Sequence, residues 1–554
     1  MNHLYKYITA IILCLSLNPI TGLMAQDDAE LIELAHEMYN FGDKQGAMEI
    51  YLQALEINPD KPISNLMAGI CYLATVDKAK AIPLLEKIYP VEQQVVEELF
   101  YFVEFPDHVY DLWEETQYIL YLIGEAYQFD YQFDTAIVYY QRYKQDIVDR
   151  EVKRKKGYKE NTLELLLKKI DRRIFECNNG KEFVEFPIGV IIQNVGKDVN
   201  SLYSEYVPLV SADQSLLIFT SRRAGSTGGN MYIDNQYYED IYISNKDGHR
   251  WTPAHNIGSN INTDLHDACI GLSPDGSQLF VYNTSNGGDI YMSTLDDNNW
   301  TVPKSFNKPI NSKFLEASAS VTADGNTLYF TSTRPYYKDL DIYKSVKDEY
   351  GVWSEPVNLG TTVNTEYDDD APFILSDNKT LTFSSKGHKG MGGYDIFRTT
   401  LSEFGTWSEP VNMGFPINTT GDDVYMVFSG DGSTGYFSSV RETGFGDQDI
   451  YKVTLPRMMS VSQSGEEGGL LDYISTYDVK KKKSLDSKVL KEVLAVAPQT
   501  KISNLPAEFR EADLDRDNYI STEEIFNIID AFFEDETDFT VDRIYALIDY
   551  FFEQ

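Results

Sequence analysis

Apolar side chains recur along this chain with two different periods. Between residues 27 and 180 they lie three or four positions apart, as in Leu31, Leu34 and Met38, which is the spacing of one face of an α-helix. Between residues 186 and 456 apolar and polar side chains alternate in short runs separated by turn residues such as Asp-Gly, which is typical of strands joined by hairpins. The pattern therefore predicts a helical region followed by an all-β region.

The helical region also repeats a pattern of small and aromatic residues. Gly69 follows Ala35 by 34 residues, and an equivalent glycine returns at Gly124. Small residues at these positions allow two helices to approach closely, and aromatic residues fill the groove between neighbouring pairs. The segment 27–180 resembles the tetratricopeptide (TPR) family over three units, which implies an α-helical solenoid.

Two roles are open for these helices at this point. A concave groove would hold a peptide or a partner helix, whereas a purely structural stack would brace the domain that follows. The basic run 153–156 and the apolar positions within 163–175 predict a final solvated helix that caps the stack.

A second repeat, about 50 residues long, extends through the segment 186–456. The tripeptide Asp-Ile-Tyr, or Asp-Ile-Phe in one copy, begins at Asp240, Asp289, Asp341, Asp395 and Asp449. Tryptophans follow the first four copies at Trp251, Trp300, Trp353 and Trp407. Each unit is predicted to form four short strands, which is the composition of one β-propeller blade.

The fifth unit lacks its last strand, but the segment 188–196, which precedes the first unit, matches that strand in sequence. Sharing one blade between the two ends of the region would close the ring and leave no exposed strand edge. The sequence thus predicts an all-β propeller of five blades, with six as the alternative. The repeats resemble the PD40, or WD40-like, propeller family that includes the TolB-type repeats.

One acidic residue occupies the same position in every β-repeat, eight residues before the turn between the first two strands. These residues are Glu205, Asp267, Glu316, Asp369 and Asp423. A ring of carboxylates could bind a cation or a basic partner segment at one mouth of the channel. The structural alternative, which we favour, is that each carboxylate ties one blade to its neighbour by accepting hydrogen bonds from backbone N–H groups. The aspartates of the Asp-Ile-Tyr units are likewise expected to fix turns.

The C-terminal part contains an acidic loop between two apolar segments. Residues 457–500 are predicted to be a linker, and residues 501–554 a small α-helical module. Oxygen donors in the loop follow the spacing that wraps six to eight hard ligands around calcium, and the segment resembles an EF-hand. The expected calcium ligands are Asp513, Asp515, Asp517, Tyr519 through its carbonyl, Ser521 and Glu524.

Two features of this module depart from a standard EF-hand. Asn518 replaces the usual glycine, which is expected to weaken calcium binding because asparagine adopts the left-handed conformation less readily than glycine. A second copy of the motif lies 19 residues downstream with Arg543 in place of Glu524, and its apolar face is expected to pair with the first copy.

Composition and charge narrow the range of functions. The 554 residues include 86 acidic and 48 basic side chains, and this net charge of −38 repels phosphate backbones and argues against nucleic-acid partners. Residues 1–25 are expected to be a signal peptide, cleaved after Ala25, since Leu13 disfavours a lipid anchor on Cys14. No later stretch approaches the ~20 apolar residues of a membrane span. The odd number of remaining cysteines (Cys71, Cys177 and Cys269) argues against a disulfide framework.

The order of signal peptide, TPR-like stack and propeller resembles the N-terminal half of Bacteroidetes-type envelope proteins of the OmpA family, including the type associated with type IX secretion. The resemblance implies an exported protein of the periplasm or outer membrane that binds envelope or secretion-apparatus proteins. The peptidoglycan-binding domain of that family is replaced here by the EF-hand-like module, so contact with peptidoglycan is not implied.

Phosphate-binding loops, zinc-ligand spacings and nucleophile elbows are missing from the sequence. We therefore expect a non-enzymatic scaffold. The alternatives are a carbohydrate-active or hydrolytic propeller enzyme, or a glycan or small-ligand sensor, that uses channel carboxylates.

Overall fold

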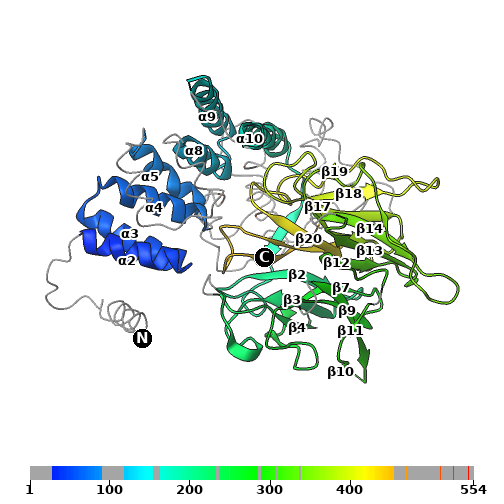
Figure 1. Ribbon diagram of the computed structural model, residues 1–554. Helices are drawn as coiled ribbons and strands as arrows, with labels where there is room; N and C mark the ends of the chain where they lie inside the picture. The colour runs from blue at the N-terminus through cyan, green and yellow to red at the C-terminus, as the bar shows by residue number, and fades with distance from the viewer. Residues whose placement is uncertain are drawn as a thin grey trace.

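The structure of the chain is a computed structural model. The structure describes residues 28–75, 77–89, 118–153, 162–232, 236–248, 250–284, 288–297, 299–306, 308–335 and 339–454, together with Leu470, Ala512, Ile528 and Leu547. Helices form the N-terminal region and strands form the rest of the described chain, as expected (Figure 1). None of the helices among these residues is long and apolar enough to cross a membrane.

Consecutive helices of the N-terminal region pack against one another. The elements are α2 (Asp28–Asn40), α3 (Lys44–Ile57), α4 (Pro62–Leu73), η1 (Lys78–Lys80), α5 (Ala81–Lys87), α8 (Tyr118–Phe129), α9 (Phe133–Lys153) and α10 (Thr162–Glu185). Each helix contacts the next one along the chain, so that the helices form a stack beside the β-region (Figure 1). The TPR assignment itself stays a prediction.

Small residues bring the paired helices together, as the repeat pattern indicates. A Cβ atom at Gly69 of α4 would lie 2.6 Å from a Leu85 side-chain carbon of α5, and one at Gly124 of α8 would lie 2.9 Å from the Tyr140 ring of α9. The start of α3 is fixed by Asp43, whose carboxylate accepts a hydrogen bond from the Gly46 N–H. Local sequence signals thus determine both the helix ends and the close contacts.

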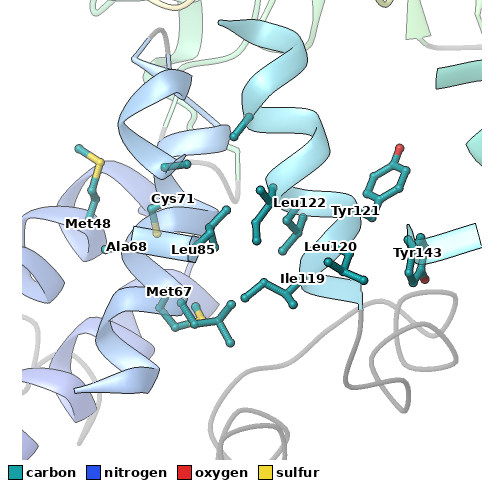
Figure 2. Packing of buried hydrophobic residues seen from close by; sticks show 14 of the residues in the cluster. Met48, Met67, Ala68, Cys71, Leu85, Ile119, Leu120, Tyr121, Leu122 and Tyr143 are labelled. Atoms are coloured by element: carbon teal, nitrogen blue, oxygen red, sulfur yellow. The ribbon is translucent and has the colours of Figure 1, made fainter. Parts of the chain in front are cut away.

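One apolar core runs through the whole helical stack. Figure 2 shows Met67 and Leu85 of the first helices pointing toward Ile119 and Leu122 of α8. Cys71 lies fully buried in the same core, and burial raises the pKa of its thiol to about 12, as expected for a small apolar residue with no reactive role.

The β-region consists of five antiparallel sheets. Blade 1 contains β2 (Glu205–Val210), β3 (Leu216–Ser221), β4 (Asp240–Asp247), β5 (Arg250–Trp251) and β6 (His255–Asn256). Blade 2 contains β7 (Asp267–Leu272), β8 (Gln278–Asn283), β9 (Asp289–Asp296), β10 (Asn299–Trp300) and β11 (Lys304–Ser305). Blade 3 contains β12 (Glu316–Val321), β13 (Thr327–Ser332), β14 (Asp341–Val346) and β15 (Val357–Asn358). Blade 4 contains β16 (Asp369–Ile374), β17 (Thr380–Ser385), β18 (Asp395–Thr400) and β19 (Val411–Asn412).

Blade 5 joins the two ends of the β-region. It contains β20 (Asp423–Phe428), β21 (Thr434–Ser439), β22 (Asp449–Thr454) and, as its outer strand, β1 (Ile191–Asn194). Strand β1 pairs antiparallel with β22, from Ile191 opposite Thr454 to Asn194 opposite Tyr451. The predicted shared blade is therefore confirmed, the propeller has five blades, and the alternative of six is wrong.

The last helix differs from its prediction as a solvated cap. Helix α10 continues to Glu185, and Glu176, Cys177 and Asn179 on one of its faces are buried. This face contacts the loop between β17 and β18 of blade 4 through hydrogen bonds to the backbone of that loop. The many charged residues of α10 led to the prediction of a solvent-exposed helix. Arginine and glutamate side chains that pair with each other at a buried interface give the same sequence pattern as an exposed helix face.

Candidate functional site

Each loop between two blades carries an asparagine that binds the preceding blade. Its side-chain amide accepts a hydrogen bond from the backbone N–H of the isoleucine in the third strand of that blade and donates one to the carbonyl of the same isoleucine. The hydrogen bonds are 2.7 to 3.0 Å long in all five loops. The five asparagines are Asn200, Asn262, Asn311, Asn364 and Asn418, all at most 6% exposed. In the sequence each asparagine directly follows an isoleucine or a valine, but no role was predicted for this pair.

The next residue of the same loop binds the following blade. Ser201, Thr263, Ser312, Thr365 and Thr419 donate their backbone N–H groups, at 2.5 to 3.1 Å, to the repeated carboxylates Glu205, Asp267, Glu316, Asp369 and Asp423. These carboxylates are at most 3% exposed. The structural interpretation of the acidic ring is therefore confirmed, since the ring links blades and does not present charge to a ligand.

The aspartates of the Asp-Ile-Tyr units have a similar structural role. Asp240 accepts from the Thr227 N–H and from the Asn256 side chain, and Asp395 accepts from the backbone N–H groups of Met391 and Gly392. These aspartates hold the loop between the second and third strands of their own blade, and Asp240 also connects it to the outer strand. This is the role expected for residues that fix turns.

Removing one bridging asparagine is expected to destabilise the propeller. Asn418→Ala would leave the buried N–H and C=O of Ile396 without partners, at a cost of about 1–3 kcal/mol each. We expect a loss of about 2 to 6 kcal/mol in the free energy of urea unfolding. Asn326→Ala, in an exposed turn, is the control and should cost less than about 0.5 kcal/mol. Equal effects of the two substitutions would contradict the bridging role.

An arginine neutralises the repeated carboxylate in three of the blades. Arg223, Arg334 and Arg441 place a guanidinium nitrogen 3.0, 2.6 and 3.3 Å from Glu205, Glu316 and Asp423. In blade 4 Gly387 has the equivalent position, and His388 Nε2 instead lies 2.8 Å from the Val363 carbonyl oxygen. Asp369 therefore has no arginine partner from its own blade. These arginines were missed in the sequence, although each follows its carboxylate by 18 residues.

Two buried aspartates of blade 4 bind protons more tightly than usual. Burial and the neighbouring Asp423 raise the pKa of Asp395 to about 8, and burial, with a contribution from Asp341, raises that of Asp369 to about 7. In the unfolded chain an aspartate has a pKa of about 3.9. The folded protein therefore holds protons that the unfolded chain releases above about pH 4.

Stability is accordingly expected to fall as the pH rises from about 4 to about 8. A group whose pKa is higher in the folded state makes its full contribution to stability below its unfolded pKa. This contribution decreases by about 1.4 kcal/mol per pH unit as the pH rises from the unfolded to the folded pKa. Urea unfolding at pH 5, 6, 7 and 8 should show a smaller slope for Asp395→Asn than for the unchanged chain. Asp213→Asn is the control, because turn hydrogen bonds lower the pKa of Asp213 to about 2. A slope unaffected by Asp395→Asn would contradict this assignment.

The central channel of the propeller is filled by apolar side chains. The first strands of all five blades line it, including Val207, Leu209, Ile270, Ala319, Phe373 and Met426, and the cavity that remains is about 30 Å³. Val207, Ala371 and Tyr425 have positive φ angles of 53°, 52° and 59° at the same position of three of these strands. Such conformations are strained for non-glycine residues. The strained positions lie where the strand register shifts, so the bulges aim the channel side chains inward.

A polar and aromatic cluster lies where the first strands begin, at one mouth of the channel. Glu239 contacts the His266 imidazole, lies 3.7 Å from Arg222 and accepts a hydrogen bond from the Tyr206 hydroxyl. Tyr238 stacks on the His266 ring with centroids 3.9 Å apart. The Glu239 carboxylate thus lies among an imidazole, a guanidinium and a phenol, groups that can bind a polar ligand. Sequence reasoning missed this cluster because its residues do not repeat among the blades.

The helical stack and the propeller meet at a buried polar junction. The Arg172 guanidinium donates to the carbonyls of Gly387 and His388 at 2.8 and 2.9 Å, and Asn179 donates to the Gly390 carbonyl at 2.8 Å. Gln128 of α8 donates to the Met391 carbonyl at 3.3 Å.

Glu176 holds the arginines of this junction. It accepts from Arg172 at 2.7 Å and from Arg173 at 3.1 Å, and its side chain is 4% exposed. Arg173 also pairs with Glu125 of α8 at 3.2 Å. The network therefore links α8 and α10 to the loop of blade 4 through a continuous set of charged contacts.

The six predicted calcium ligands, Asp513, Asp515, Asp517, Tyr519, Ser521 and Glu524, lie outside the described residues. Among the residues that the structure does describe, no group of three or more histidine, cysteine or acidic side chains could hold a metal ion. Ile528 and Leu547, which the repeated motif aligns with each other, are both helical and buried.

Comparison with known proteins gave structural similarity only. No family model and no curated protein sequence matches the chain. TolB from Acinetobacter baumannii is similar with 17% identity and a TM-score of 0.29 over 48% of this chain and 56% of TolB. An α-L-arabinofuranosidase from Lactobacillus brevis is similar with 13% identity and a TM-score of 0.32 over 50% of this chain and 97% of that enzyme. The NanB sialidase from Streptococcus pneumoniae is similar with 13% identity and a TM-score of 0.27 over 39% of this chain and 36% of the sialidase. The assignment of five blades rests on the strand pairing of the chain itself.

Proposed function

We propose that this protein is an exported, non-enzymatic scaffold that binds partner proteins through its helical stack and its propeller. The polar junction between α10 and blade 4 carries this proposal, because it joins the two regions through buried contacts into one unit. A stack and a propeller held in fixed geometry present two binding surfaces at a defined separation, which favours simultaneous binding of two partners or of two parts of one partner.

The repeated carboxylates support the same proposal. In a propeller enzyme that used them, they would have to face a substrate-sized channel. Here they accept hydrogen bonds from the backbone and from hydroxyl groups, and apolar side chains fill the channel. The partners proposed are proteins of the envelope or of the secretion apparatus, and the proposed location is the periplasm or the outer membrane.

The experiment is cross-linking and affinity isolation of the tagged full chain from envelope fractions. We expect a defined set of proteins with the full chain, and a reduced set when Glu176→Ala uncouples the two regions. Failure to recover partners, together with turnover of oligosaccharides or peptides by the purified protein, would replace the scaffold by the enzymatic alternative.

A second candidate function is the sensing of a glycan or another small polar ligand at the channel mouth. The cluster of Glu239, His266, Arg222 and Tyr206 favours it, because carboxylate, imidazole and guanidinium groups beside aromatic rings are suited to polyhydroxylated ligands. Calorimetric titration with a panel of envelope oligosaccharides tests it. Binding that Glu239→Gln weakens would support the sensor, and no heat with any sugar would reject it.

The C-terminal module is proposed to bind one calcium ion. The four carboxylates among the expected ligands repel one another without a cation, so calcium should order the loop and add helix. In a fragment of residues 500–554 we expect heat release and helix gain on titration at millimolar calcium, and Glu524→Ala should abolish both because it removes a bidentate ligand. Ser503→Ala, outside the loop, is the control. Neither heat nor helix gain in the unchanged fragment would mean that the loop is only an acidic turn.

A further inference from the structure

The loops at the channel mouth differ between the two sides of the propeller. On the side of blade 4, the helical stack contacts them through α10, and Tyr131 and Lys78 of the stack also approach the loops of blade 5 at Thr420 and Asp447. The loops of blades 5, 1 and 2 instead carry large apolar side chains that are exposed to solvent. These are Leu202, Met231, Tyr232, Leu265 and Phe445, which are 82%, 48%, 50%, 46% and 45% exposed.

These side chains belong to one continuous surface, which we name the aromatic face. The Tyr232 ring lies 6.1 Å from the His266 ring, next to Leu265, and the Tyr203 ring, next to Leu202, lies 5.9 Å from the Tyr237 ring. The loop that carries Phe445 approaches the same place, since a Cβ atom added at Gly446 would lie 2.2 Å from the Tyr203 carbonyl oxygen. Blades 5, 1 and 2 thus each contribute to the aromatic face.

The charge around the aromatic face is negative. The exposed ionisable residues described in segments 197–204, 222–232, 236–239, 258–266 and 440–448 are Asp198, Asp264, Glu442, Asp447 and one cation, Lys197. The arginines of these loops point elsewhere: Arg222 lies near Glu239, and Arg223 and Arg441 are paired with the buried carboxylates of the blade linkers. Lys78 and Lys80 of the helical stack lie within electrostatic range of Asp447 and Glu442, and the four exposed carboxylates against one exposed lysine in the loops themselves favour a positively charged partner.

Exposed aromatic side chains next to one another are typical anchors of protein interfaces, and the surrounding charge selects the partner. We infer that the aromatic face binds a basic amphipathic peptide segment of a partner protein, with Tyr232 and Phe445 contacting its apolar side chains and Glu442 and Asp447 contacting its lysines or arginines. This inference rests on the proposed scaffold function and names one of its surfaces and the chemistry of the partner.

The test uses the full chain and three fluorescent probe peptides of equal length. The first alternates lysine and leucine at helical spacing, the second replaces lysine by glutamate, and the third replaces leucine by serine. Fluorescence anisotropy should show binding of the lysine-leucine peptide alone, and the affinity should fall with added salt because charge contributes. Tyr232→Ala combined with Phe445→Ala should weaken binding about tenfold or more. Glu442→Lys combined with Asp447→Lys should do the same and remove the salt dependence.

The control variant removes two aromatic side chains of similar exposure elsewhere. Tyr350 and Phe404 are 82% and 92% exposed in hairpins of blades 3 and 4, and Tyr350→Ala with Phe404→Ala should leave binding unchanged. Circular dichroism confirms that each variant is folded.

Three results would overturn the inference. The first is that the lysine-leucine peptide does not bind at millimolar concentration. The second is that the control variant weakens binding whereas the Tyr232/Phe445 variant does not; either result rejects the aromatic face as the peptide-binding site. Self-association that is lost in the Tyr232/Phe445 variant, measured by sedimentation velocity, would assign the face to a second copy of the chain. If any of these results is obtained but the cross-linking experiment still recovers partners, the scaffold function is supported and only the inference about the aromatic face is wrong. Failure of the inference can therefore be distinguished from failure of the proposed function.

Discussion

Replacing residues 188–196 by a glycine-serine segment of equal length is expected to unfold the whole propeller. The segment contains β1, which completes blade 5, and its Ile188 and Val190 side chains are 4% and 2% exposed. Burial of each such side chain contributes about 1.5–3 kcal/mol, and the lost strand also leaves the β22 edge unpaired. A domain is stable by only about 5–15 kcal/mol, so losing the closing strand removes a large part of the total.

The unfolding should be cooperative because the five blades form one ring. Near-ultraviolet circular dichroism and tryptophan fluorescence should lose their native signals together, with a melting temperature at least about 10 °C lower or no native signal at 25 °C. The control replaces the exposed turn 348–351 by a glycine-serine segment of the same length and should leave the melting temperature nearly unchanged. A closing-strand variant that melts as the unchanged chain does would refute the shared blade.

Glu176→Ala is expected to separate the helical stack from the propeller. The substitution leaves Arg172 and Arg173 at the junction without the carboxylate that both contact, and breaking a buried ion pair by removing one partner costs about 3–5 kcal/mol. Hydrogen exchange measured by mass spectrometry should increase in α10 and in residues 386–393, while the distant blades 1 and 2 stay protected.

The matched control is Asp134→Ala, which removes an ion pair of the same stack at the surface. The Lys181–Asp134 pair joins side chains that are 40% and 86% exposed, and its loss should cost less than about 1 kcal/mol. If the two variants show the same exchange pattern, the charged junction does not hold the regions together, and the argument for a single binding unit fails.

The order of the elements and the number of blades could be predicted from the sequence. The spacing of the Asp-Ile-Tyr units, the turn residues between alternating runs and the match of 188–196 to the missing strand led to five blades, which the pairing of β1 with β22 confirms. These features are predictable because strands and turns are determined by side chains close in sequence, and a repeated unit multiplies the signal. The calcium loop and the export signal remain predictions from the sequence.

The roles of the charged residues could be predicted only in part. Hydrogen bonding of the acidic ring to backbone N–H groups was expected. A residue that recurs in every blade is suited to the contact with the neighbouring blade, which also recurs in every blade. The exchange of arginine for Gly387 in blade 4 was overlooked, although the constant spacing of 18 residues between carboxylate and arginine makes it visible in the sequence.

The sequence by itself thus determined the periodic features of this protein, namely the helical stack, the five blades and the position of the shared strand. Only the tertiary structure decided which charged side chains are buried and paired. Arg172 reaches Gly387 across 215 residues of sequence, and Glu239 meets His266 only because blade 1 is placed beside blade 2. The burial and pairing of such non-repeated charges depend on neighbours brought together by folding, and these neighbours have no fixed spacing along the chain.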